Sequence, residues 1–206
     1  MNIFSVDSRF FKLMEVLTNF FLLNLLWIVM CIPIVTIFPA TSAMFGVVRQ
    51  WVLKKDSSVF RSFFQLFKEN FKTSIIIGVL WFLISGLLIL DIYFAFTLGS
   101  TTKFVLLPVL LVIGFLFLLT STFLFPVIVH YQLKWNTIIK NSFLLGVSHF
   151  HVVLISFLIT IAMLLTFVYL PILVLVIFSI GSYFTYKFCH RTFEKIENKQ
   201  EEKASL

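Results

Sequence analysis

Charged residues are scarce in this chain of 206 residues. Only 12% of them are Asp, Glu, Lys or Arg, against 60% hydrophobic residues and a mean hydropathy of +1.06. Soluble globular domains carry about 25% charged residues, so this composition lies far outside their range. The composition therefore predicts a protein whose main solvent is lipid.

Cysteines are few, and the common catalytic motifs are absent. Cys31 falls inside one apolar run and Cys189 at the end of another, which excludes an extracellular disulfide framework. The chain has no HExxH pair, no Walker A loop and no nucleophile elbow. His149 and His151 are two residues apart and would point to different faces of a helix. We therefore predict that the protein is not an enzyme and binds no metal or cofactor.

Long apolar runs are what the sequence does contain. A helix needs about 20 apolar residues to cross the hydrocarbon core of a bilayer, and five runs reach or approach that length. Continuous runs without strand-like alternation predict helices and not a barrel. The runs cover residues 20–38, 74–98, 104–129, 152–170 and 172–188. The expected fold is all-α, a single membrane domain forming a polytopic helix bundle of about five transmembrane helices plus amphipathic cytoplasmic helices.

The distribution of Lys and Arg predicts an orientation. With five spans, thirteen of the sixteen cations fall on one side, and only Arg9, Lys12 and Lys103 fall on the other. Since cytoplasmic loops carry the excess of Lys and Arg, we expect a multi-pass cell-membrane protein with residues 1–19 outside and the charged tail 189–206 in the cytoplasm. Merging the runs on either side of Leu170 and Pro171 into one kinked helix would erase this bias.

Two other interpretations of the charge and the first run are weaker. The net charge of +7 suggests a nucleic-acid partner only if a folded cationic face exists, whereas here the cations flank membrane runs and suit the lipid bilayer. The small residues Ala40 to Ala43 could form a signal-peptide cleavage site. Cleavage there would place the cation-rich segment that follows outside, so we do not favour it.

The segment 40–72 is predicted to be an amphipathic cytoplasmic loop. Phenylalanines recur in it at spacings of three and four, as they do on one face of a helix. They are Phe60, Phe63, Phe64, Phe67 and Phe71. Such a helix either packs against its own bundle, lies among lipid headgroups, or is a candidate docking helix for a partner protein.

The densest local pattern joins the first run to this loop, and it is a candidate functional motif. Two prolines six residues apart interrupt the helical hydrogen bonds, and two threonine hydroxyls are placed to satisfy the carbonyls so freed. The break either lines a cavity or merely redirects the chain. The motif residues are Asn24, Trp27, Pro33, Thr36, Pro39, Thr41 and Arg49.

At this motif the chain resembles the YesL family of bacterial membrane proteins, a domain of unknown function. The resemblance covers the motif residues, the Pro39-Ala40-Thr41 sequence, and the stretch from Phe63 to Phe71 with Lys68 and Asn70. The family usually has glycine where this chain has Phe38, so a role that needs close backbone approach at that position is not expected. The resemblance implies association with carbohydrate uptake and utilisation systems, often beside sugar ABC transporter subunits.

Three functions follow from these observations. The first is a non-enzymatic accessory component of a bacterial carbohydrate uptake or utilisation system. The second is a small autonomous transporter or channel, functioning as a homo-oligomer, in which Asp91 is the one candidate coupling site. Asp91 falls near the outer end of its run, where a solvated helix end is the simpler interpretation. The third is a membrane assembly or sensing factor acting through the phenylalanine-striped helix.

Overall fold

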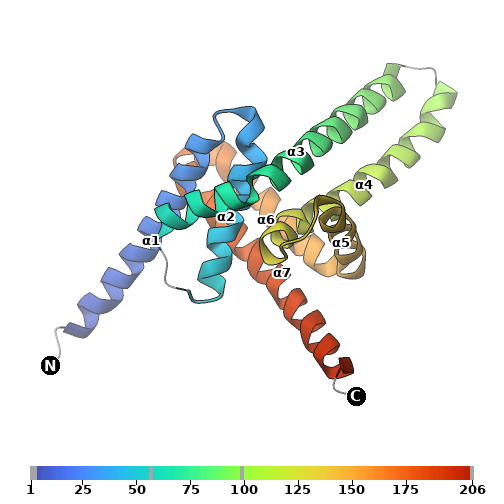
Figure 1. Cartoon of the computed structure of the whole chain (residues 1–206). Helices are drawn as coiled ribbons and strands as arrows, with labels where there is room; N and C mark the ends of the chain where they lie inside the picture. The colour runs from blue at the N-terminus through green and yellow to red at the C-terminus, as the bar shows by residue number, and fades with distance from the viewer. Residues whose placement is uncertain (1–3, 56–57, 98–99, 205–206) are drawn as a thin grey trace.

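A computed structural model of the chain describes residues 4–55, 58–97 and 100–204. In that part of the chain every regular element is helical, which confirms the predicted all-α helix bundle (Figure 1). The elements are α1 (Phe4–Met30), η1 (Ile34–Thr36), α2 (Ile37–Val52), α3 (Val59–Thr97), α4 (Ser100–His130), α5 (Trp135–Ser148), α6 (Phe150–Tyr169), η2 (Pro171–Leu173) and α7 (Val174–Ala204), where η marks a 3-10 helix.

Four helices are long and apolar enough to cross a membrane. The qualifying segments are Phe10–Met30, Val59–Thr97, Leu106–His130 and Phe150–Tyr169. The predicted fifth span, 172–188, is not among them. Its helix begins only at Val174 and meets its first cation at Lys187. At 1.5 Å per residue, this leaves an apolar run of about 20 Å for a hydrocarbon core of about 30 Å.

The first membrane helix lies earlier in the chain than the apolar run suggested. The predicted span was 20–38, whereas α1 extends from Phe4 to Met30 and includes most of the predicted lead-in 1–19. Pro33 explains the early end, because proline cannot donate a backbone hydrogen bond and disfavours helical geometry in the residue before it. Pro39 lies in the first turn of α2, where a missing N–H costs little.

The chain turns back on itself after α1, so that α2 is antiparallel to α1 and to the first half of α3. Along α1 and α2, Trp27 contacts Thr41, and Phe20 contacts Trp51. Along α2 and α3, Gly46 faces Leu66 and Phe38 packs on Gly78. Consequently α1 and α3 run in the same sense (Figure 1). The start of α1 lies at the end of the bundle where α2 finishes, whereas the predicted arrangement put these two points on opposite sides.

Helix α2 forms the centre of the core. Ten of its sixteen residues, from Phe38 to Val48, are buried. On one side it packs against Leu23 of α1 and Phe63 and Phe67 of α3, and on another it contacts Phe125 of α4. The segment 40–72 is thus not a surface loop, because its first half is the most buried helix in the described structure.

Helices α6 and α7 form a hairpin. The Met163 side chain packs on Gly181, and these two residues are equally distant from the turn at Pro171–Leu173. A single continuous helix would separate them by about 27 Å at 1.5 Å per residue. The alternative of one kinked helix is therefore excluded.

The close contact between α4 and α5 makes a specific stability prediction. A Cβ atom on Gly146 of α5 would lie 2.7 Å from the backbone oxygen of Leu119, whereas one on Gly114 would meet nothing within 4 Å. We expect Gly146→Ala to lower the thermal midpoint in detergent, since overpacking costs about 1–3 kcal/mol and exceeds the gain of about 1 kcal/mol in helix propensity. Gly114→Ala is the matched control and should not lower it. Equal midpoints for the two variants would contradict the close packing.

Candidate functional site

The motif residues around the break at Pro33 and Pro39 connect α1, α2 and α7. Asn24 is fully buried, and its side-chain amide donates a hydrogen bond to the backbone oxygen of Val174 at the start of α7. One turn earlier in α1, the backbone oxygen of Phe20 accepts a hydrogen bond of 2.9 Å from the Ser179 hydroxyl of α7. The Thr36 hydroxyl is 2.6 Å from the Met30 oxygen and 2.7 Å from the Pro33 oxygen. It thus satisfies a carbonyl freed by the break, as the sequence predicts.

Trp27 and Thr41 connect this region to a cavity. The indole N–H of Trp27 donates to the Thr41 hydroxyl at 3.1 Å, and that hydroxyl in turn donates to the Ile37 oxygen at 2.7 Å. The indole ring lies 5.0 Å from the ring of Phe178 on α7. Both motif residues line a cavity of about 530 Å³ between α2, α4, α6 and α7. Of the two alternatives that the sequence left open, this arrangement suits a cavity next to the motif, although the residues of the break itself, 33–39, do not line it.

The cavity is mainly apolar but contains several hydroxyl groups. Its apolar wall includes Phe45, Phe125 and Phe178, and the rim residues Leu118 and Phe157 are exposed on the outside of the bundle. The hydroxyls come from Thr41, Ser121, Thr122, Ser156, Thr160, Ser182 and Thr185. Such a lining suits an apolar or weakly polar molecule that enters from the lipid phase.

Arg49, the last residue of the motif, lies apart from the cavity in a chain of polar side chains. Its guanidinium lies beside the hydroxyl of Tyr186, a fully buried residue of α7. That hydroxyl is 3.2 Å from Nδ1 of His130, and Nε2 of His130 is 3.0 Å from the Glu197 carboxylate. The chain links α2, the end of α4 and the C-terminal part of α7.

The carboxylate end of this chain determines the direction of one hydrogen bond. An ionised carboxylate can only accept, so Nε2–H of His130 donates to Glu197. The role of Nδ1 towards the Tyr186 hydroxyl depends on the protonation of the ring: a neutral imidazole accepts there, and a protonated one donates.

Tyr131 donates a second hydrogen bond to Glu197, at 3.3 Å. Burial, followed by the nearby Glu197 charge, raises the pKa of Tyr131 to about 12. The hydrogen bond from His130 is the main cause that lowers the pKa of Glu197 below its ordinary value of 4.5. Because the folded-state pKa is the lower one, this stabilisation is complete above about pH 4.5 and is lost as the pH falls through the lowered value.

The phenylalanines of the predicted docking helix are divided between the core and the surface. Phe63 is fully buried and Phe67 is 8% exposed, both against α2. Phe64 is partly buried, while Phe60 and Phe71 are exposed. The structure thus supports packing within the bundle for the centre of the stripe, and leaves only its two ends accessible.

Asp91 lies in the last two turns of α3, away from the cavity and the polar chain. Its side chain is exposed.

Sequence reasoning missed the partners of Arg49. It gave no role to His130, Tyr186 or Glu197. One pattern could have revealed them, because Tyr186, His190, Phe193 and Glu197 recur at spacings of four, three and four along one face of α7. The pairing of that face with His130, 67 residues from Glu197, has no sequence signature.

Four membrane-length helices around a buried α2 define a polytopic helical membrane protein. Residues 20–92 match the family described as "Protein of unknown function, DUF624". The chain is 30% identical over 171 residues to the uncharacterized protein YteU of Bacillus subtilis (strain 168), which covers 80% of this chain and 75% of YteU. It is 32% identical over 130 residues to the uncharacterized protein YesL of the same organism, covering 61% of each chain. The chain belongs to this YesL-like DUF624 family, and no solved structure matches it.

The polar chain predicts how firmly the end of α7 is held. Replacing Glu197 with alanine removes the acceptor for both His130 and Tyr131, so we expect trypsin to cleave after Lys195 and Lys199 several-fold faster at neutral pH in Glu197→Ala than in the wild type. Glu201→Ala, which removes an exposed carboxylate from the same helix, is the control. Similar cleavage rates for the two variants would show that Glu197 does not hold α7.

Proposed function

We propose that this protein is a non-enzymatic accessory component of a bacterial carbohydrate uptake or utilisation system, and that the C-terminal part of α7 is its docking element. One observation carries the proposal. The hydrogen-bond chain that ends at Glu197 attaches α7 to the end of α4, and beyond it the helix continues to Ala204 (Figure 1). A helix fixed in this way is already ordered before a partner binds, which lowers the entropic cost of binding.

The surface of this helix suits a polar partner. Its inner face, with Cys189, Thr192 and Phe193, is buried in the bundle. Its outer face exposes cations at Lys195 and Lys199 and carboxylates at Glu194, Glu201 and Glu202. A face of mixed charges favours a complementary protein surface over a lipid headgroup layer. The resemblance to the YesL family suggests sugar ABC transporter subunits as the partners.

The cavity supports a second candidate, a small autonomous transporter or channel. Its volume of about 530 Å³ would hold a small molecule. However, a sugar has hydroxyls over its whole surface and needs many hydrogen-bonding partners, whereas the walls here are built largely from Phe, Leu and Met side chains. The cavity therefore suits an apolar occupant better than a sugar, and we rank the transporter second.

The third candidate, an assembly or sensing factor acting through the phenylalanine stripe, has less support. Phe63 and Phe67 are occupied in packing against α2. Charged substitutions at these two positions would disrupt the core, and their effect could not be attributed to a lost partner.

The helix directions also support a revised orientation in the cell membrane. This orientation needs two helices that are shorter than a full span to return the chain: the buried α2 between α1 and α3, and α7 as the second helix of its hairpin with α6. If α1 and α3 then both run from the cytoplasm outward, the N-terminus joins the C-terminus on the cytoplasmic side. Fifteen of the sixteen Lys and Arg then lie on that side and only Lys103 lies outside. This bias is stronger than in the arrangement with an external N-terminus, and it agrees better with the excess of cations in cytoplasmic segments.

Copurification tests the docking proposal. From cells grown on complex carbohydrates, the wild type in mild detergent should recover a sugar permease or its ATPase at stoichiometric level. Lys195→Glu/Lys199→Glu should lose that partner, because it reverses the exposed charges of α7. The matched control, Lys54→Glu/Lys55→Glu, reverses two exposed cations after α2 and should keep it.

Two further results would argue for the transporter instead. One is recovery of the chain alone while known membrane complexes survive the same detergent. The other is passage of a sugar through liposomes that contain only this protein.

Reporter fusions test the orientation. Green fluorescent protein folds in the cytoplasm and stays dark when exported through the general secretion route, so fusions at either terminus should both fluoresce. Alkaline phosphatase inserted beside Lys103 should be active, because it needs the oxidising exterior. A dark N-terminal fusion beside a bright C-terminal one would restore the external N-terminus.

A further inference from the structure

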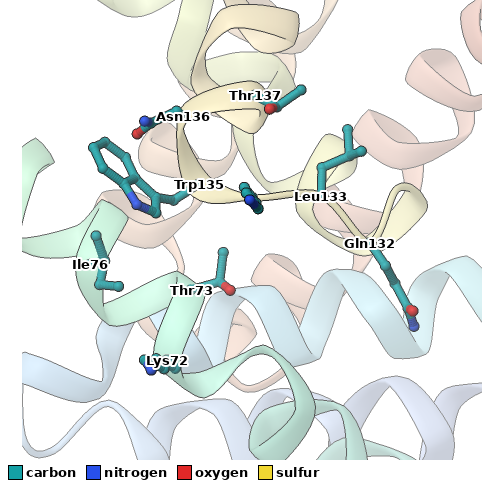
Figure 2. A pocket seen from close by; sticks show the side chains of 9 residues that line it. Lys72, Thr73, Ile76, Gln132, Leu133, Trp135, Asn136 and Thr137 are labelled. Carbon is teal, nitrogen blue, oxygen red and sulfur yellow. The ribbon is translucent and has the colours of Figure 1, made fainter.

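A hollow on the surface lies where α3 meets the start of α5. It has a volume of about 520 Å³ and lies next to the connection between α4 and α5. Figure 2 shows Trp135 above Ile76, with Lys72 and Thr73 below and Asn136 and Thr137 above. The complete lining is Lys72, Thr73, Ile76, Gln132, Leu133, Lys134, Trp135, Asn136 and Thr137. Neither the polar chain nor the cavity beside Trp27 includes any of these residues.

The charge of the hollow has one sign. Lys72 and Lys134 are its two charged lining residues, and no carboxylate is among the nine. Two ammonium groups around one hollow repel each other, and an anion between them relieves that repulsion. The amide and hydroxyl groups of Gln132, Asn136 and Thr137 add neutral hydrogen-bond donors. This set of donors suits the oxygens of a phosphate group.

The other side of the lining is apolar, and exposed apolar residues of α3 lie next to it along that helix. Ile76 belongs to the membrane-length helix α3, and the Leu133 and Trp135 side chains are more than a third exposed. Phe71 and Val79, on the same stretch of α3, are also exposed. Tryptophan beside lysine is typical of the membrane interface, where one part of the ligand is charged and the other is hydrocarbon.

We propose that this hollow binds the phosphate headgroup of an anionic membrane lipid, with Lys72 and Lys134 contacting the phosphate and Trp135, Ile76 and Leu133 contacting the upper acyl chain. A free phosphate ion would use the lysines but leave the apolar side unoccupied, which is why the lining favours a lipid. The site is independent of the α7 docking element. Failure of one proposal would therefore leave the other standing.

The test uses the full chain in nanodiscs of phosphatidylcholine with increasing phosphatidylglycerol, and native mass spectrometry counts the bound lipids. Lys72→Gln/Lys134→Gln should bind phosphatidylglycerol about a hundredfold more weakly, since each charge-assisted hydrogen bond to the phosphate contributes roughly a tenfold change in affinity. The control, Lys68→Gln/Lys140→Gln, removes the same charge from exposed positions on α3 and α5 outside the hollow. It should bind nearly as well as the wild type.

A second readout follows Trp135 directly. In the wild type, phosphatidylglycerol brominated near the headgroup should quench tryptophan fluorescence more than brominated phosphatidylcholine does, and Trp135→Phe should remove the difference. This comparison holds even if the double lysine variant does not fold.

Three results would overturn the proposal. The two double variants could lose phosphatidylglycerol equally, which would mean that only the general surface charge matters. Phosphatidylcholine could quench Trp135 as strongly as phosphatidylglycerol. Inorganic phosphate at millimolar concentration could displace the lipid, which would assign the hollow to a soluble phosphate instead.

Discussion

The arrangement of the bundle depends on a break in a membrane helix at which a side-chain hydroxyl replaces a lost backbone donor. Pro33 ends the hydrogen bonding of α1, and in a hydrocarbon environment each carbonyl left without a donor costs several kcal/mol, on the order of the stability of a whole domain. The Thr36 hydroxyl contacts the Met30 and Pro33 oxygens and so makes the break tolerable. The chain can then turn back as α2, and the buried Asn24 attaches the same region to the start of α7.

Once α2 has turned inward, the other helices are organised around it. It presents Thr41 to the cavity, its middle to α3, and Arg49 to the polar chain. A single short helix thereby connects an apolar site within the bundle to the attachment of α7 at its end. The two regions share one rigid element, so a change in the packing of α2 would affect both.

The sequence predicted the helical class, the break at the prolines and the role of Thr36, because these depend on local chemistry and on the length of apolar runs. It left open whether the break lines a cavity or only redirects the chain. It did not predict the inward path of α2, since periodicity shows that one face of a segment is apolar but not what covers that face. For the same reason the spacing of Phe63 and Phe67 could not distinguish a docking surface from a part of the core. The contact between His130 and Glu197 depends on how two distant helices cross, which no local pattern encodes.

Phe38 and Gly78 illustrate how a large side chain is accommodated next to the break. The ring of Phe38 takes the space next to Gly78, where an added Cβ atom would lie 2.8 Å from it. The two positions, forty residues apart in the chain, therefore share one volume. A substitution at one of them therefore constrains the other. Enlarging residue 78 first would meet a steric clash, whereas shrinking residue 38 first would open a void, which costs about 3–5 kcal/mol for a change as large as phenylalanine to alanine. Only a paired exchange, small at 38 and larger at 78, would keep the volume filled.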